Sequence, residues 1–505
     1  MTFRIGPRVL DDQADRLDII TPQKFIPLAE PYRESNRLPR ELLTGMAEEG
    51  LFGLNLPESY GGQGLPYTAT LAVHRERFGY FHPVCDATYG LQTLGTGAIV
   101  HVGSPEQQER YFQGLITGEL VFAFGLTEPH SGSDVMSMKT NVRRDGDDWV
   151  LNGQKMFISG SPDADAYVTF ARSGEGRNDV TAFIIEKGTP GFTPRGDLDV
   201  AARHPIGYLD FDECRVSDAQ RIGPVHGGLG GSFGTLQSYR PSVGAFGVGI
   251  GRRAHDIALD FARGRESFGT KLIDLDTVRA RLGRLWAGVE AGGALVTRAS
   301  ALRDAGEAGT VEVAAAKFHA TEHANRATYD SQQLHGGRGV LIDSEPYYLS
   351  RHARATSIYE GSSEVQRFII GRAELRRQAS GTAVDRDGDG LTGWVRRGYE
   401  TWLAAYAGLP GADQREQRIG NLYTAVLAAE TTADDDRRDG AASWAASCEL
   451  LAADAAVEVL AALIELPESA AVDAAIAEGR SAVRAGGRSR DDLALAVAAA
   501  RIAED

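Results

Sequence analysis

The sequence predicts a mainly α-helical protein with a small β-domain in its middle. Apolar residues recur at helical spacing before about residue 121 and again after about residue 234, which indicates helices at both ends. Short β-rich runs separated by glycine-containing turns fill the stretch between them. The 505 residues are 42% hydrophobic and 24% charged, so several domains with buried cores are expected. We place the domain boundaries at 1–121, 122–235, 236–380 and 381–505.

The first domain is expected to be helical. Leu43, Met46 and Leu51 fall on one side of an early segment. Ser104 precedes Pro105, and this order predicts a helix that starts with Ser104 as its N-cap and Pro105 in its first turn.

The second domain is expected to be a small β-domain or barrel of about 100 residues. Its predicted strands lie at 149–151, 156–158, 167–170 and 182–185. Turns are predicted at Asn152-Gly153 and at 188–191, because glycine and proline interrupt the β-rich runs there.

Helical spacing resumes after Gly234 and continues to about Arg377. Turn and charged residues at 381–393 predict a linker. Alanine-rich segments with helical spacing follow, so residues 394–505 are expected to form a helical extension.

Composition excludes several classes of protein. The net charge of −16 argues against nucleic acid as the main partner. No apolar stretch approaches the ~18 residues of a membrane span, and the charged N-terminus lacks the apolar core of a signal peptide, so we expect a cytoplasmic protein. The three cysteines are too scattered for a disulfide framework or a zinc site.

Three short motifs have ordinary structural explanations. The H-x-x-E-H pattern at 319–323 is expected to be a helix face without a metal, because no third ligand is evident. The G-x-S-x-G pattern at 230–234 lacks the strand that precedes a nucleophile elbow, so we expect a glycine-rich loop. A calcium-loop pattern starts at Asp385, but its twelfth position is Arg396, which favours a polar linker.

Five other segments contain side chains suited to binding or chemistry. They are 124–134, 152–159, 265–269, 333–339 and 358–366. The first is a tight turn with N–H and hydroxyl donors. The second leads into a strand on which Phe157 and Ser159 are expected to share one face, so the ring can stack a ligand whose edge the hydroxyl binds. In the third, Arg265 is a candidate pyrophosphate ligand or a partner for the helix dipole.

Glu360 is the candidate general base. It follows the apolar pair Ile358 and Tyr359 and precedes Gly361, so its carboxylate is expected to be desolvated yet open on one side. Desolvation raises the pKa of a carboxyl group and makes it a better base. The alternative is a solvated carboxylate on a turn.

These five segments, in this order, resemble the acyl-CoA dehydrogenase family over about residues 20–378. The shared elements are L-T-E-P-x-x-G-S-D, N-G-Q-K-x-x-I-S, R-x-x-F-G, G-G-x-G and I-Y-E-G-[ST]-S. The resemblance implies an N-terminal helical domain, a central β-domain and a C-terminal four-helix bundle. It also implies FAD as cofactor and a homodimer or homotetramer in which a neighbour completes each FAD site.

The resemblance assigns roles by position. Glu360 is the catalytic base, and Tyr359, Gly361 and Arg240 contact the substrate. The cofactor-binding positions are Phe124, Leu126, Thr127, Gly132, Ser133, Phe157, Ser159, Arg265, Ser267, Phe268, Gln333, Gly337, Ser362 and Glu364.

The implied reaction converts an acyl-CoA into a trans-2-enoyl-CoA. Glu360 removes the α-proton, the β-hydrogen passes to flavin N5 as hydride, and the Glu360 N–H with a ribityl hydroxyl polarises the thioester carbonyl. Electrons then pass to electron-transferring flavoprotein or another acceptor. One alternative substrate is a thioester on a carrier protein, which basic residues at 372, 376 and 377 would favour. An acyl-CoA oxidase is a second alternative. A flavin monooxygenase is a third, but the intact I-Y-E-G-S run argues against it.

Two departures from the family pattern motivate a non-enzyme alternative. Asp276 and Glu364 stand where glutamines are common, and their charges oppose a pyrophosphate unless Lys or Arg lies close, so a scaffold without FAD is a further hypothesis. Gly90 and Gly95 hint at room for an acyl chain whose length the sequence leaves open.

Overall fold

The computed structural model describes residues 10–382, 390–407, 415–433, 442–466, 470–485 and 492–497. The described residues divide into two compact units, one that ends at Tyr239 and one that begins at Arg240. The N-terminal helices and strands β1 to β8 share the first unit, and the helical bundle, the short strands β9 and β10 and the extension share the second.

Helices begin the first unit. Their bounds are α1 Asp11–Ile20, α2 Ile26–Ala29, α3 Arg40–Glu48, α4 Tyr67–Phe81, α5 Pro83–Val102 and α6 Pro105–Ile116. The start of α6 is confirmed, because the Ser104 hydroxyl accepts the Gln107 N–H at 3.2 Å and the Gln107 side chain accepts the Ser104 N–H at 3.0 Å. Leu43 and Met46 are fully buried on one side of α3, as their spacing predicted.

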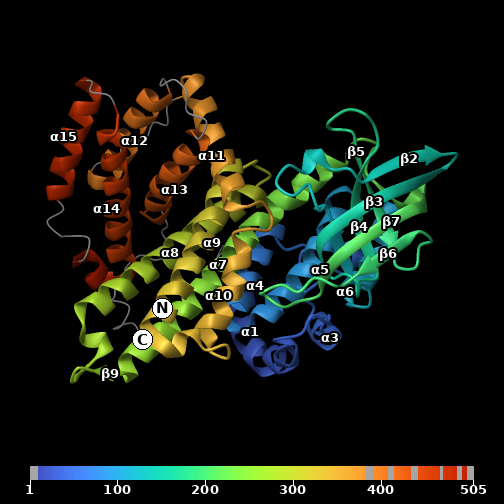
Figure 1. The fold of residues 1–505 in the computed structure, drawn as a ribbon, viewed down its shortest axis with the longest axis horizontal. Coiled ribbons are helices and arrows are strands. Elements are labelled where there is room, and N and C mark those ends of the chain that lie inside the picture. The colour runs from blue at the N-terminus through green and yellow to red at the C-terminus, as the bar shows by residue number, and fades with distance from the viewer. Residues whose placement is uncertain are drawn as a thin grey trace. The chain divides into compact units, whose positions relative to one another are not determined.

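The described strands of the first unit form one eight-stranded sheet in the order β6-β7-β3-β2-β4-β5-β8, with β1 pairing in parallel with β4. Figure 1 shows β2, β3, β4 and β7 side by side. The strand bounds are β1 Phe122–Gly125, β2 Asn141–Asp145, β3 Asp148–Ser159, β4 Ala166–Arg172, β5 Val180–Glu186, β6 Phe192–Arg195, β7 Ile206–Ser217 and β8 Arg221–Ile222.

The predicted turn at Asn152-Gly153 is wrong. Strand β3 continues through it, and a register shift between Leu151 and Gly153 marks a β-bulge. Gly153 has φ 141°, and a Cβ there would lie 2.6 Å from the Cα of Thr140, the residue before β2, so this position needs glycine for that close approach. The hairpin turn lies instead at Gly146, with φ 65°, between β2 and β3.

A second irregularity in β3 lies at Phe157. The register shifts between Met156 and Ile158, so Phe157 is the extra residue of a bulge. The exposure still alternates here, because Phe157 is exposed, Ile158 is buried and Ser159 is half-buried, so the expected shared face of Phe157 and Ser159 stays a prediction.

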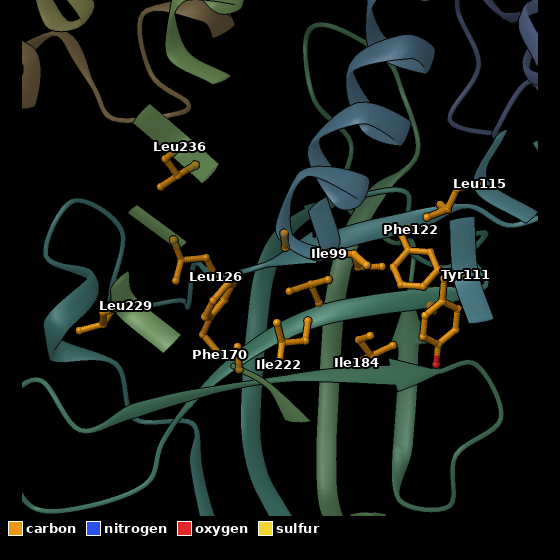
Figure 2. Close-up of a cluster of buried hydrophobic side chains, with 14 of the residues drawn as sticks. Ile99, Tyr111, Leu115, Phe122, Leu126, Phe170, Ile184, Ile222, Leu229 and Leu236 are labelled. Carbon is orange, nitrogen blue, oxygen red and sulfur yellow. The ribbon is translucent and has the colours of Figure 1, made fainter. Parts of the chain in front are cut away.

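A buried apolar cluster joins α5 and α6 to the sheet (Figure 2). Ile99 of α5 and Tyr111 of α6 lie in one cluster with Phe122, Phe170 and Ile184 from the strands, and the rings of Tyr111 and Phe122 pack with their centroids 5.1 Å apart. Because all five are largely removed from water, this cluster stabilises the packing of helices on strands.

The expected room at Gly90 and Gly95 is filled by protein. A Cβ at Gly90 would lie 2.8 Å from the Tyr239 hydroxyl, which donates to the Gly90 carbonyl at 2.7 Å. A Cβ at Gly95 would lie 2.4 Å from the Phe122 carbonyl oxygen. These glycines therefore allow α5 to pack closely on Tyr239 and β1 and give no sign of acyl-chain length.

Helix α7 spans Gly228–Gly264, so its first turns belong to the first unit and its remainder to the second. Residues 230–234, which were expected to form a loop, have helical backbone within α7. The second unit continues with β9 Glu266–Ser267, β10 Thr270–Lys271, α8 Asp276–Asp304, α9 Thr310–His335, α10 Glu345–Thr356 and α11 Ser363–Ala379.

The extension contributes α12 Gly390–Ala407, α13 Arg415–Ala433, α14 Ala442–Ile464 and α15 Ala470–Ala485. Its helical character is confirmed over these ranges, whereas the predicted linker is shorter, because α12 already begins at Gly390. Residues 383–389, with most of the calcium-loop pattern, lie outside the described residues. Helix α13 packs tightly on α11, since a Cβ at Gly420 would lie 2.3 Å from the Arg367 carbonyl oxygen.

In the described part of the chain, no helix has both the length and the apolar character needed to cross a bilayer. The same residues contain no group of three His, Cys, Asp or Glu arranged for a metal ion. The two imidazoles of the H-x-x-E-H pattern lie against α8 instead, where His319 Nε2 is 3.3 Å from the Gly288 carbonyl oxygen and His323 Nε2 is 2.8 Å from that of Leu285.

Candidate functional site

The L-T-E-P turn is joined to strand β3 by a buried ion pair. Lys155 Nζ lies 2.8 Å from Glu128 Oε1 and also donates to the Leu126 carbonyl at 3.1 Å. The Glu128 carboxylate accepts the backbone N–H groups of Lys139 at 2.6 Å and Thr140 at 3.0 Å. The Glu128 carboxylate thus joins the L-T-E-P motif to the N-G-Q-K motif, and both of its oxygens accept hydrogen bonds.

Burial and pairing act in opposite directions on the pKa values of this pair. It lowers the pKa of Lys155 to about 8, although the charge of Glu128 opposes the shift. Burial acts to raise the pKa of Glu128, but the Lys155 charge and the donated N–H bonds outweigh it, and that pKa is lowered. The sequence interpretation gave neither residue a role, although a lysine in the middle of a strand with apolar neighbours was a visible signal.

The predicted cofactor residues of the first motif lie in or beside this pinned turn. Phe124 is half-buried, with its ring 5.1 Å from that of Phe170, and Leu126 is buried in the cluster of Figure 2. The Thr127 carbonyl accepts the Met156 N–H at 2.9 Å, which links the turn again to β3. Gly132 and Ser133 are exposed.

Phe157 and Ser159 occupy different environments. Phe157 has a φ of 59° and is 52% exposed, an unusual combination for a bulky residue within a strand. The Ser159 hydroxyl lies 3.1 Å from His204 Nε2, while His204 Nδ1 lies 2.7 Å from the Ala202 carbonyl oxygen. Burial lowers the pKa of His204, so its neutral ring donates through Nδ1 and accepts the Ser159 hydroxyl proton. Sequence reasoning did not find His204.

In the second unit, the turn around Glu360 is strained and firmly anchored. Glu360 has φ 55° and Gly361 has φ 89°, both in the left-handed region. Arg240 Nε donates to the Glu360 carbonyl at 3.0 Å. Lys317 Nζ and Gln366 Nε2 both donate to the Gly361 carbonyl, at 2.8 Å and 2.9 Å. Three helices, α7, α9 and α11, therefore fix two consecutive carbonyls.

Both cations at this turn are buried. Arg240 is 7% exposed and Lys317 is fully enclosed. Burial lowers the pKa of Lys317 to about 7, and the Glu360 carboxylate opposes this shift. Burial likewise lowers the pKa of Arg240, with Glu360 opposing. Glu360 itself is half-exposed.

Lys317 and Gln366 are the residues that sequence reasoning missed here. Lys317 stands alone within the alanine-rich run 314–316 and Ala320 on α9, and those alanines are buried. A single cation on such an apolar helix face was a detectable signal, because a buried lysine requires a partner.

The two acidic departures from the family pattern are each neutralised locally. Glu364 Oε1 lies 3.0 Å from Arg367 Nη2, and the Asp276 carboxylate pairs with Arg279. Both acids stand in the first turn of a helix, α11 and α8, where the helix dipole also favours a negative charge. Ser362 is the N-cap of α11, and its hydroxyl accepts the Val365 N–H at 3.4 Å.

The remaining predicted cofactor residues form a separate group at the far end of α9. Ser267 and Phe268 belong to the β9–β10 hairpin, in which Phe268 has φ 53° and a fully exposed ring, and Arg265 precedes it at the end of α7. Gln333 lies on the last turn of α9. Sixteen positions separate it from Lys317, about 24 Å along a helix. The structure thus does not bring this group to Glu360.

Gly337 and the loop after α9 are also exposed. Tyr329, Val340, Leu341 and Ile342 add large apolar side chains to the surface near the end of this helix. Exposed apolar residues in such number are typical of a surface that binds another molecule.

The chain matches three family models that follow one another. They are the acyl-CoA dehydrogenase N-terminal domain over residues 16–119, the middle domain over 123–214 and the C-terminal domain over 226–375. An acyl-CoA dehydrogenase of Bacillus subtilis is 33% identical over 357 residues, which are 69% of this chain and 93% of that protein.

Solved structures agree with these matches. Butyryl-CoA dehydrogenase from Megasphaera elsdenii has a TM-score of 0.70 and 29% identity, covering 74% of this chain and all of that one. An acyl-CoA dehydrogenase from Bacillus anthracis, solved with FAD, has a TM-score of 0.85 at 22% identity and shares the fold over 99% of this chain and 96% of its own, the extension included. The chain therefore belongs to the acyl-CoA dehydrogenase family.

Proposed function

We propose that this chain is a FAD-dependent enzyme that removes an α-proton and a β-hydride from an acyl thioester, with Glu360 as the base. One observation carries the proposal: Glu360 is a half-exposed carboxylate on a left-handed turn whose carbonyl is held by buried Arg240. A left-handed non-glycine residue costs about 1–3 kcal/mol and persists only where its surroundings impose it. Such strain is concentrated at functional sites.

The residues present fit a flavin dinucleotide. The exposed aromatic rings of Phe157 and Phe268 offer surfaces for stacking, and the exposed Arg265 offers a cation for phosphate. Asp276 and Glu364 are paired with arginines, which removes the main argument for a scaffold without FAD. The other residues proposed to hold the cofactor are Phe124, Leu126, Thr127, Gly132, Ser133, Ser159, Ser267, Gln333, Gly337 and Ser362.

Each residue at the Glu360 turn has a proposed role in the reaction. The Glu360 carboxylate takes the α-proton, and its backbone N–H polarises the thioester carbonyl while negative charge develops there. Arg240 holds the Glu360 carbonyl, and Tyr359 and Gly361 flank the substrate. The flavin, when bound, supplies the acceptor for the β-hydride.

Coenzyme A is the favoured carrier of the acyl group. The chain is acidic and an acyl carrier protein is acidic too, so the two would repel each other. The basic residues that would reverse this preference are partly neutralised, because Arg377 pairs with Glu374 and Glu400.

Electrons are proposed to leave through electron-transferring flavoprotein or another acceptor. A homodimer or homotetramer is proposed as the assembly, supported by the exposed Phe268 hairpin and the apolar loop at 340–342.

The test is anaerobic titration of the purified protein with acyl-CoA and carrier-bound thioesters of several lengths. A yellow protein whose oxidised-flavin absorbance is bleached by a thioester supports the proposal. Protein that stays colourless after FAD is added would contradict it and support the scaffold. Rapid recolouring in air with formation of hydrogen peroxide would identify an acyl-CoA oxidase.

A further inference from the structure

We propose that Lys317 is a positioning residue for Glu360: its ammonium group holds the Gly361 carbonyl, and its positive charge acts on the neighbouring carboxylate. The inference rests on the proposed role of Glu360 as the base. It assigns a function to a buried cation that the reaction itself does not use.

The geometry makes Lys317 one of three clamps on the turn. Arg240 of α7 fixes the Glu360 carbonyl at 3.0 Å, and Lys317 of α9 fixes the next carbonyl, of Gly361, at 2.8 Å. Gln366 of α11 donates to the same oxygen at 2.9 Å, so both lone pairs of that carbonyl are used. A Cβ at Gly361 would lie 2.6 Å from Gln366 Nε2, which leaves the turn little freedom to move.

A hydrogen bond alone does not explain a lysine at this place. Gln366 already supplies a neutral donor to the Gly361 carbonyl. Burying an ammonium group is costly, and the fully enclosed Lys317 is surrounded by buried alanines on its own helix. The arrangement is understandable if the charge itself is needed, and the Glu360 carboxylate on this turn acts electrostatically on Lys317.

The electrostatic surroundings support this reading. Glu360 on the turn, Arg240 on α7, Glu322 on α9 and Glu364 on α11 all act on Lys317. Glu364 is paired with Arg367, and Glu322 accepts the Ser363 hydroxyl, so both have other partners. Because the pKa of Lys317 is about 7, its charge is largely present at acidic pH, where a carboxylate base loses its proton-accepting form. Lys317 therefore extends the range in which Glu360 stays ionised.

The experiment compares Lys317→Met with Gln366→Met in the FAD-loaded enzyme. Both variants remove one donor to the Gly361 carbonyl, but only the first removes a charge. We measure the rate constant of flavin bleaching by saturating acyl-CoA between pH 5 and 9, together with FAD content. Lys317→Met is expected to keep FAD and to bleach up to ~10²-fold more slowly. The acidic limb of its pH profile, in which the rate falls as the pH is lowered, is expected to lie at a higher pH than in wild type. Gln366→Met is expected to slow bleaching without moving that acidic limb.

Equal acidic limbs in wild type and Lys317→Met would overturn the electrostatic role, and wild-type rates would overturn the positioning role as well. Should Lys317→Met fail to fold, Lys317→Gln keeps a neutral donor in a similar volume, and its acidic limb must move in the same direction. If no thioester bleaches the wild-type enzyme, the proposed function fails instead. The ¹³C NMR titration of the Glu360 carboxyl, assigned with Glu360→Gln, then decides: removal of the cation must raise the pH at which it titrates.

Discussion

Lys155 places its ammonium nitrogen 2.8 Å from a carboxylate oxygen of Glu128, and both side chains are buried. The pair connects the turn of residues 127–134 to strand β3, and Glu128 also caps two backbone N–H groups of the chain after the turn. Lys155→Met is therefore expected to lower the free energy of unfolding by about 3–5 kcal/mol, because it leaves a buried carboxylate without its cation. Urea unfolding followed by tryptophan fluorescence measures this loss.

The matched control for that prediction is Asp134→Asn. Asp134 lies in the same turn and forms an ion pair with Arg177, which lies between β4 and β5. Both partners of that pair are largely exposed. Its removal is expected to cost less than about 1 kcal/mol. Similar losses in the two variants would mean that burial of the Lys155 pair has no special weight.

The buried lysine at position 317 predicts a pH-dependent stability. Its pKa is about 7 in the folded protein and 10.5 in a model peptide, so the unfolded chain binds more protons between these values. Stability contributed through this group therefore rises with pH above about 7. The melting temperature of wild type relative to Lys317→Met is expected to increase from pH 7 to pH 9. A difference that stays constant or falls over this range would contradict the pKa shift.

Gly95 is predicted to be required for packing. An alanine Cβ would lie 2.4 Å from the Phe122 carbonyl oxygen, so Gly95→Ala is expected to destabilise the protein by about 1–3 kcal/mol. At Gly234, on the helical start of α7, a Cβ meets nothing within 4 Å. Gly234→Ala is expected to be neutral or to stabilise by up to about 1 kcal/mol. Thermal melting of the two variants tests both the close approach and the helical backbone, and a destabilising Gly234→Ala would argue for the loop instead.

The extension is predicted to depend on the close contact between α11 and α13. Gly420→Val places side-chain atoms where a Cβ is already 2.3 Å from the Arg367 carbonyl oxygen, and should lower the melting temperature by several degrees. Glu465→Gln, which breaks an exposed ion pair with Arg418, is the control and should change it little. Limited proteolysis should release fragments of residues 381–505 from Gly420→Val first, and equal resistance of both variants would contradict the packing.

The sequence predicted the helical and β-rich regions well, because amphipathic spacing and N-cap chemistry are local. Ser104 and Gln107 form the expected capping box, and the extension is helical where it is described. The strand boundaries failed at Asn152-Gly153 because a glycine in a bulge and a glycine in a turn look alike. Only the neighbouring chain, which approaches Gly153 at Thr140 just before β2, distinguishes them.

Only part of the candidate site was predicted, because here too local patterns are readable from the sequence and long-range contacts are not. Glu360 was recognised from its neighbours along the chain, and Arg240 by resemblance. Lys317, by contrast, meets the turn 44 residues away from it in sequence, and His204 meets Ser159 across 45 residues. Such contacts depend on how helices and strands pack, which local spacing does not encode.

The central claim, that Glu360 is the base, is tested most directly by the rate of flavin bleaching in Glu360→Gln. This variant keeps the size and the hydrogen-bonding atoms of the side chain but cannot accept a proton as a carboxylate does. Its FAD content and oxidised spectrum should match wild type, while bleaching by an acyl-CoA that reduces the wild-type enzyme should fall by at least ~10²-fold. Bleaching of Glu360→Gln at the wild-type rate would show that another residue removes the proton.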